Sequence, residues 1–286
     1  MSLKTVIKKH KRLFRFAQYV NYWALNFGVD IAKLLAVRRF PGVVKEFFML
    51  KKQNKCTASG WKLKFTMPSL YDMYEDSGVA SGHYFHQDLL VAQRIFTRKP
   101  VRHVDIASRV EGFVAHVATF RTIEVLDIRP LTSKTPNIIF RQCDFTQIPD
   151  ELTDYCDSVS CLHAIEHFGL GRYGDRIDIN GHLRGFDSLY KLLKPDGILY
   201  LSFPIGTERI EFNAHRVFAI KSPLEWAKNR FELTGFSYVD DQGDLHENVA
   251  VDNNTLADNF DLHYGCGIYE FRKIGIPVTA PVADRV

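Results

Sequence analysis

Apolar positions in the middle and C-terminal parts of the chain gather in short runs that polar, Gly- or Pro-containing segments separate. The runs are rich in β-branched and aromatic residues, a composition typical of buried strands. Helix-compatible or loop segments lie between them, which indicates parallel strands joined by crossover connections. The predicted strands are Val101–Asp105, Glu124–Asp127, Asn137–Asp144, Cys156–His163, Gly197–Pro204 and Tyr264–Lys273.

Two further segments fit an alternating α/β order. Leu192–Gly197, LLKPDG, ends a helix and turns through Pro-Asp-Gly into the next strand. His215–Val239 is typical of a loop, a helix, a glycine turn and a strand. A chain of 286 residues with 46% hydrophobic residues is long enough to bury one substantial core and to carry an appendage.

The first predicted strand ends in a carboxylate and leads into a loop of small residues. Asp105 is followed by Ala107, Ser108 and Gly112, and the second strand ends in Asp127, 22 positions after Asp105. This order opens many nucleotide-binding α/β sheets, because small residues let the backbone approach a ligand at a helix start. A turn or helix-cap role for each aspartate stays open as the alternative.

The order of these pieces resembles the class I S-adenosylmethionine-dependent methyltransferase fold over roughly residues 80–275. The segment His163–Asp175, HAIEHFGLGRYGD, is also similar to that of an uncharacterised methyltransferase-like family. The resemblance implies a Rossmann-like α/β fold with a seven-stranded, mostly parallel sheet whose last strand is antiparallel. It further implies S-adenosyl-L-methionine as the cofactor. The cofactor-binding residues that it implies are Asp105, Ala107, Ser108, Gly112, Asp127, Ile128, Asp144 and Phe145.

The loop after the first strand departs from the glycine-rich pattern of that family. Ala107 and Arg109 stand where glycines are expected. Because alanine adopts a positive φ less cheaply than glycine, we expect a less contorted loop or a ligand that sits slightly farther out. The same absence argues against a nicotinamide dinucleotide, which needs close backbone approach to a pyrophosphate.

Candidate catalytic groups lie where the fourth and fifth strands end, beside the expected ligand site. They are His163, Glu166, His167 and His215. Methyl transfer chiefly requires alignment of donor and acceptor, and a base is needed only for a hydroxyl acceptor. Each of these residues has a structural alternative, as a helix cap or as a hydrogen bond that orders a loop.

Candidate acceptor contacts come from the segment after the fourth strand and from an aromatic segment before the first. They are Tyr84, Arg172, Tyr173 and Asp175, and for Tyr84 a core position is the alternative. Five glycines between Gly169 and Gly185 predict a mobile segment that covers the acceptor.

The sequence predicts no bound metal. His163–His167 has the H-x-x-E-H spelling of inverted zinc proteases, but His163 ends a strand, so the two histidines would not share one helix face. A magnesium variant, as in a small-RNA 2′-O-methyltransferase family, needs a glutamate where His163 stands. Five cysteines without a C-x-x-C pair give neither a zinc motif nor a disulfide framework, and we expect a reducing, cytoplasmic compartment.

Charge is distributed unevenly along the chain. Residues 1–55 hold 13 Lys and Arg against Asp30 and Glu46, whereas the rest holds 24 Lys and Arg against 31 acids. Polar residues interrupt the apolar run of this segment, so neither a signal peptide nor a membrane span is expected. A helical cap on the other domain and a basic amphipathic helix on an anionic membrane surface both fit, and a nucleic-acid partner is not expected.

The sequence therefore predicts an S-adenosylmethionine-dependent methyltransferase, with a basic helical extension over residues 1–55 and one α/β domain over residues 56–286. We expect the acceptor to be a small molecule or a glycan. The methyl group would be transferred to an oxygen of a polar acceptor, for example a glycan or a sugar nucleotide. The enzyme would be cytoplasmic, and the membrane-surface interpretation of residues 1–55 would add peripheral attachment to the membrane. The alternative hypothesis is a non-catalytic binding or scaffold protein that kept the fold while its loop lost the glycines.

Overall fold

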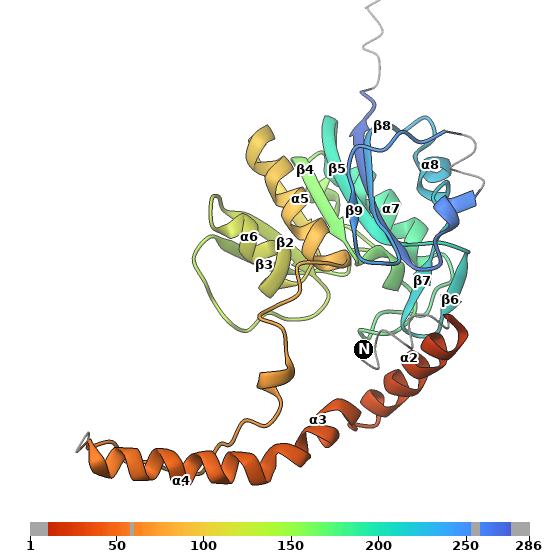
Figure 1. Ribbon diagram of the computed structural model, residues 1–286. Coiled ribbons are helices and arrows are strands. Elements are labelled where there is room, and N and C mark those ends of the chain that lie inside the picture. Colours follow the sequence, from red (N-terminus) through yellow and green to blue (C-terminus); the bar gives the residue numbers. More distant parts are fainter. Residues whose placement is uncertain (1–10, 58–59, 253–257, 276–286) are drawn as a thin grey trace, which may run out of the picture. The chain divides into compact units, whose positions relative to one another are not determined.

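The computed structural model describes residues 11–57, 60–252 and 258–275. Contacts divide the chain into two compact units, Met1–Val79 and Ala80–Val286, and each is described by itself. The first unit is helical, as the sequence predicted (Figure 1). Its helices are α2 (Lys11–Asn26), α3 (Ile31–Ala36) and α4 (Phe40–Cys56), with 3-10 turns at Val37–Arg39 and Asp72–Tyr74.

Aromatic side chains make the main local contacts of the first unit. The Trp23 ring of α2 lies 6.2 Å from the Tyr19 ring and 6.0 Å from the Phe27 ring, measured between ring centres. Phe65 meets Phe40 and Phe47 edge-on, so the chain after α4 returns along that helix. Among the described residues, none of the helices combines the length and the apolarity needed to cross a membrane.

A sheet forms the centre of the second unit, in the order β3–β2–β1–β4–β5–β10–β8–β9 (Figure 1). Strands β1 to β5 are parallel, and β10 is antiparallel to both of its neighbours, β5 and β8. The predicted architecture is confirmed, but the sheet has eight strands and not seven, because the two-residue strand β9 extends its edge. The strands are β1 (His103–Ile106), β2 (Ile123–Asp127), β3 (Ile138–Gln142), β4 (Cys156–Leu162), β5 (Leu193–Ile205), β8 (Phe231–Val239), β9 (Leu245–His246) and β10 (Gly265–Lys273).

Helices cover both faces of this sheet (Figure 1). Because successive side chains of a strand point to opposite faces, each strand contributes to two cores. In β10, Cys266 and Ile268 belong to one core, whereas Tyr269 and Phe271 belong to the other. The first core is covered by α5 (His83–Arg98), the π-helical turn Val110–Val114 and α6 (Ala115–Ala118), and the second by α7 (Gly181–Leu192) and α8 (Ser222–Ala227).

Two short strands, β6 (Arg209–Glu211) and β7 (His215–Val217), form a separate hairpin between β5 and α8. The glycine turn predicted before the following strand is wrong. Gly235 lies inside β8, next to Thr234, which is the extra residue of a β-bulge in the pairing with β10. The left-handed residue that precedes β8 is Asn229, with φ of +62°.

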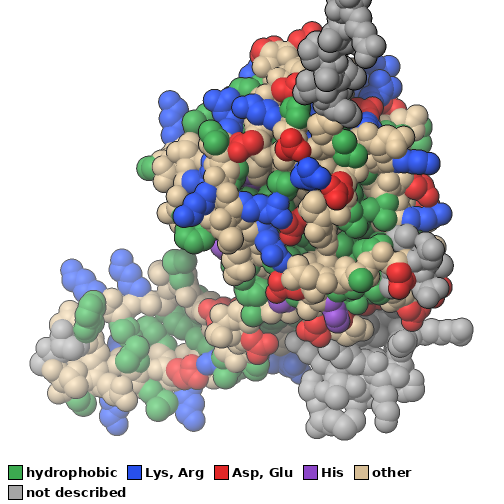
Figure 2. Space-filling model, turned by 90° about the horizontal axis from the view of Figure 1, so that it is seen from above, with side chains coloured by type: hydrophobic (Ala, Val, Ile, Leu, Met, Phe, Trp, Pro, Cys, Tyr) green, Lys and Arg blue, Asp and Glu red, His purple; other side chains and the backbone are tan. Residues whose placement is uncertain are grey.

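Charged side chains of the second unit are mixed by sign on the face shown in Figure 2. Acidic and basic groups alternate over that surface, so the described side chains there do not form the basic stripe that is typical of nucleic-acid binders.

The loop after β1 has a left-handed backbone at Ala107, with φ of +58°. The expectation of a less contorted loop is therefore wrong. Neighbouring groups hold this conformation: Ala107 N donates to Leu126 O at 2.9 Å, and both Ser108 N and Ser108 Oγ donate to the Asp105 carboxylate. An alanine in this region carries a strain of roughly 1–2 kcal/mol that a glycine would not.

Replacing Ala107 by glycine should leave the free energy of unfolding unchanged or raise it by up to about 1 kcal/mol. The relieved strain is partly offset by the greater freedom of glycine in the unfolded chain, worth about 0.5–1 kcal/mol. Denaturant unfolding measures the change. Ala115→Gly is the matched control, because Ala115 has ordinary helical angles (φ −62°) and should lose about 0.5–1 kcal/mol. An equal loss at both positions would contradict the strain argument.

Candidate active site

A cavity of about 540 Å³ opens at the carboxyl ends of β1, β2, β3 and β4. This is the edge where open α/β sheets bind ligands, beside the point at which the strand order reverses. The volume lies within the range of roughly 300–1,000 Å³ that is usual for small-molecule sites. The wall comes from Tyr84 and from segments within 107–111, 125–131, 143–146, 162–168 and 172–175.

Asp105, the penultimate residue of β1, lies behind the loop and not on the cavity wall. Its carboxylate accepts hydrogen bonds from Ser108 N (3.0 Å), Ser108 Oγ (2.7 Å) and Ser160 Oγ (2.6 Å). Complete burial raises the pKa of Asp105 to about 7, although these hydrogen bonds act in the opposite direction. Asp105 therefore fastens the loop to β4.

Asp127 ends β2 on the cavity wall, where its carboxylate is paired with Arg129. Oδ1 accepts from Arg129 N (2.8 Å) and Nε (3.1 Å), and Oδ2 accepts from a terminal guanidinium nitrogen (2.6 Å). The central carbon (Cζ) of the Arg129 guanidinium lies 4.4 Å from the ring centre of Tyr173. Sequence reasoning missed Arg129, although its place two positions after a strand-end acid is a signal that could have found it.

The end of β3 brings Asp144 and Phe145 to the same wall. Thr146 N and Oγ1 donate to Asp144 Oδ1 at 2.9 and 2.7 Å, a turn that fixes the carboxylate. Buried Phe145 and half-buried Ile128 add an apolar surface. The predicted cofactor residues that line the cavity are Ala107, Ser108, Asp127, Ile128, Asp144 and Phe145.

Gly112, the remaining predicted cofactor residue, does not line the cavity. A Cβ at this position would come within 2.6 Å of Asp88 Oδ2 on α5. The glycine therefore lets this turn approach α5 closely, which is a packing reason for its presence.

His163, Glu166 and His167 lie together in the turn after β4. His163 has φ of +50°, and its Nδ1 lies 2.8 Å from Glu166 Oε1. His167 Nδ1 lies 2.6 Å from Ala214 O, so Nδ1 carries the proton and Nε2 has the lone pair. This Nε2 lies 3.8 Å from Glu166 Oε1. Both histidines line the cavity, whereas Glu166 is buried behind them.

Burial and charge set the protonation of this turn. Burial lowers the pKa of His167, and the nearby Glu166 opposes this only in part. Burial raises the pKa of Glu166, but the two neighbouring imidazoles outweigh it, so the net shift is downward. A neutral imidazole with a carboxylate beside it is able to accept a proton.

The loop after this turn is fastened by Asp175. Its Oδ2 accepts hydrogen bonds from Gly169 N (2.7 Å) and Gly171 N (3.3 Å), and its Oδ1 accepts one from Tyr173 N (3.2 Å). Arg172 donates to Ala214 O at 2.7 Å. The predicted acceptor contacts in this loop, Arg172, Tyr173 and Asp175, all line the cavity.

Three glycines of this region serve close packing, and for them the prediction of a mobile cover over Gly169–Gly185 is wrong. Gly181 and Gly185 belong to α7. A Cβ at Gly169 would come within 2.0 Å of Asp178 O, and a Cβ at Gly185 within 2.4 Å of the Phe168 ring. At Gly181 a Cβ would meet the Phe168 carbonyl at 2.7 Å.

Of the two remaining predicted residues, Tyr84 lies on the cavity wall and His215 does not. Tyr84 lines the cavity, and its ring centre lies 4.8 Å from that of His163. His215, in β7, does not line the cavity, and its ring lies 5.2 Å from the Tyr264 ring. The cavity thus brings together His163, His167 and Tyr84 but leaves His215 outside.

Several solved structures are similar to this chain. One is Burkholderia thailandensis 1,6-didemethyltoxoflavin-N1-methyltransferase with bound 1,6-didemethyltoxoflavin and S-adenosylhomocysteine (TM-score 0.49, 11% identity, 83% of this chain and 90% of that one). Others are the 4+2-cyclase SpnF (TM-score 0.48, 16% identity, 66% and 82%) and the N-methyltransferase NodS from Bradyrhizobium japonicum (TM-score 0.45, 12% identity, 73% and 93%).

No curated protein matches this chain. A family model described as Caenorhabditis protein of unknown function, DUF268, matches residues 103–259. The match covers more than half of the chain, begins at β1 and includes most of the cavity wall. The chain therefore belongs to the DUF268 family.

Proposed function

We propose that this protein is an S-adenosylmethionine-dependent methyltransferase that acts on a hydroxyl group of a polar acceptor. The observation that carries the proposal is one cavity with two chemically different sides. Asp127 and Phe145 at strand ends form a side suited to a nucleoside, whereas His167 and Tyr173 belong to a side with a base and an aromatic surface. Donor and acceptor would thus meet in one space.

The lining residues fit the methyl donor in chemistry and in volume. Asp127 would accept the ribose hydroxyls, and Ile128 and Phe145 would contact the adenine, with Asp144 beside it. The backbone at Ala107 and Ser108 would pass close to the donor. When bound, S-adenosylmethionine supplies a methyl group that is already activated on a sulfonium.

Arg129 sets a condition on donor binding. It takes three of the roughly four acceptor positions of the Asp127 carboxylate, so a ribose has to share or displace the guanidinium. This pairing is also the observation that favours a second candidate function, a non-catalytic protein that keeps the fold. Donor binding without turnover of any acceptor would support that second function.

His167 is the proposed general base. Its Nδ1–H donates to Ala214 O, which leaves Nε2 to take the proton of an acceptor hydroxyl. Glu166, 3.8 Å from Nε2, stabilises the imidazolium that forms. His163 suits this role less, because its Nε2 is buried and belongs to a cluster with His83 and Cys266.

Cationic and aromatic groups on the acceptor side favour a glycan or a sugar nucleotide. The Tyr173 ring lies near two guanidinium groups, at 4.4 Å from Arg129 and 5.2 Å from Arg172. Guanidinium groups bind phosphate oxygens in bidentate fashion, and an aromatic face packs against the apolar face of a sugar ring. A diphosphate-linked sugar would use both features.

Asp127→Asn should weaken binding of S-adenosylmethionine at least tenfold, because the loss of a charged acceptor of hydrogen bonds costs about 1.5–3 kcal/mol. Titration calorimetry measures the affinity. Asp150→Asn is the control, since it removes the same charge from an exposed carboxylate outside the cavity. If folded Asp127→Asn binds the donor as tightly as Asp150→Asn does, Asp127 does not contact the donor.

His167→Gln should lower turnover by about 10²–10⁴-fold and leave donor affinity unchanged, since only proton removal is affected. Formation of S-adenosylhomocysteine with a panel of sugar nucleotides measures turnover. His215→Gln is the control and should change turnover little, because His215 does not line the cavity.

The decrease of wild-type turnover at acid pH provides a further check on His167. Because burial lowers the pKa of His167, the rate should hold at neutral pH, and its fall on the acid side should be centred below the ordinary pKa of histidine. Equal losses of turnover in His167→Gln and His215→Gln would refute the assignment.

We further propose that the helical extension binds an anionic membrane surface. The helical spacing of α2 puts Phe16, Tyr19, Val20 and Trp23 on one face, in a segment whose formal charge over residues 1–55 is +11. Each basic group near such a surface contributes about 1 kcal/mol.

The full chain should sediment with phosphatidylserine vesicles at low salt and be released as salt is added, because screening weakens the attraction. Trp23→Ser should reduce the bound fraction by removing an inserting side chain. Trp61→Ser, an aromatic substitution outside α2, serves as the control. Absence of wild-type binding at low salt would exclude the membrane interpretation.

A further inference from the structure

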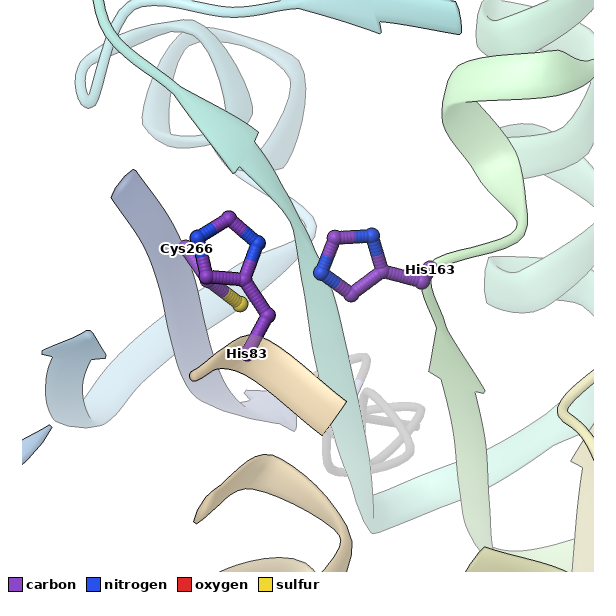
Figure 3. A group of neighbouring side chains, drawn as sticks. All are labelled: His83, His163 and Cys266. Carbon is purple, nitrogen blue, oxygen red and sulfur yellow. The ribbon is translucent and has the colours of Figure 1, made fainter. Parts of the chain in front are cut away.

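Three side chains able to bind a metal converge from three elements of the second unit (Figure 3). His83 begins α5, His163 follows β4, and Cys266 belongs to β10. One ligand atom of each lies within 4.8 Å of the other two. Positions 80 and 103 residues apart in the sequence thus meet at one point.

The His163 ring has one engaged nitrogen and one without a partner. Nδ1 lies 2.8 Å from Glu166 Oε1, whereas buried Nε2 has no hydrogen-bond partner among the described residues. The side chain is only 5% exposed. Figure 3 shows the second nitrogen facing His83 and Cys266. A buried polar atom in this state is rare in proteins, and a bound ion is one of its recognised explanations.

We propose that His83, His163 and Cys266 bind one zinc ion, with a fourth coordination position left for water or another ligand. Two imidazoles and one thiolate are donors that zinc accepts readily, and three protein ligands with one open position recur in zinc proteins. Magnesium and calcium require oxygen ligands. Copper is the competing metal, because two imidazoles and one thiolate with a weak axial methionine, glutamine or backbone oxygen form blue-copper sites. Residues 80–286 contain no methionine, but Gln87 Oε1 lies 3.8 Å from Cys266 Sγ.

The distances are compatible with a small adjustment on binding. Tetrahedral bonds of about 2.0–2.3 Å separate the ligand atoms by about 3.3–3.8 Å. The 4.8 Å limit observed for this cluster therefore requires a contraction of about 1 Å. His83 lies at the start of its helix, with its ring stacked on those of His163 and Tyr264, so a ring rotation there can supply it.

The buried charges near the cluster favour a divalent cation. Glu166 is buried, and its Oε2 also has no hydrogen-bond partner among the described residues. A metal-bound Cys266 thiolate adds a second negative charge, and one zinc ion balances both. The Glu166–His163 contact is the carboxylate–histidine arrangement that orients metal-binding imidazoles.

The consequence for the fold is a cross-link of α5, β4 and β10 beside the cavity. His163 also lines that cavity, so the ion would fix one part of its wall. The zinc proposal does not depend on the proposed methyl transfer, and its test uses neither donor nor acceptor.

The full chain, stripped with a chelator and then titrated with zinc, should bind one zinc ion per chain. Cobalt in the same site should give a thiolate-to-cobalt charge-transfer band. Cys266→Ser should abolish this band and weaken zinc binding at least hundredfold. Glu166→Gln should keep the band and weaken binding about 10–100-fold, as expected of a group that orients a ligand. Cys143→Ser, a half-buried cysteine outside the cluster, should change neither readout.

Failure of the wild-type chain to bind stoichiometric zinc would overturn the proposal, as would a cobalt band that persists in Cys266→Ser. Circular dichroism checks that the variants fold. If Cys266→Ser does not fold, His83→Gln at the start of α5 replaces it and should weaken zinc binding to a similar extent. Unchanged zinc affinity in folded His83→Gln would equally refute the site.

Discussion

The carboxylate of Asp105, buried at the end of β1, holds together the part of the fold on which the cavity depends. It binds the following loop through Ser108 and the neighbouring strand through Ser160. These bonds keep the left-handed turn at Ala107 in place without a glycine. The arrangement has a thermodynamic cost. The pKa of Asp105 rises from 3.8 to about 7 on folding, so its contribution to stability is present at acid pH and is lost as pH rises through that window.

The sheet was predictable because its central strands are buried on both faces, and burial on both faces produces continuous apolar runs in a sequence. Cys156–Leu162 and Gly265–Lys273 are visible as strands for this reason. The antiparallel direction of the last strand came from the family resemblance and not from the apolar pattern. Strand β9 was not predictable, since Leu245–His246 is too short to form a pattern. Gly235 was predicted to form a turn because the sequence does not distinguish a glycine beside a β-bulge from a glycine in a turn.

The candidate site was predictable where side chains follow strand ends, because parallel strands deliver their carboxyl ends to one edge. Asp127, Asp144, His163 and His167 meet at one cavity on this principle. Contacts between residues far apart in the sequence could not be predicted. No local pattern connects His83 with Cys266, and the two meet only because α5 packs on β10. The structural reason for a glycine also could not be predicted. The glycines at 169, 181 and 185 suggested a mobile loop, but in the structure Gly169, Gly181 and Gly185 permit close packing.

The Arg129 side chain contacts both sides of the cavity, the side of Asp127 and the side of Tyr173. Its guanidinium is bonded to Asp127 and lies over the ring of Tyr173, so a ligand that takes the Asp127 oxygens changes the surroundings of that ring. Any resulting change in affinity on the Tyr173 side is matched by an equal change on the Asp127 side, because coupling between two binding equilibria is reciprocal. The strength of the coupling between two ligands is then a property of one ion pair.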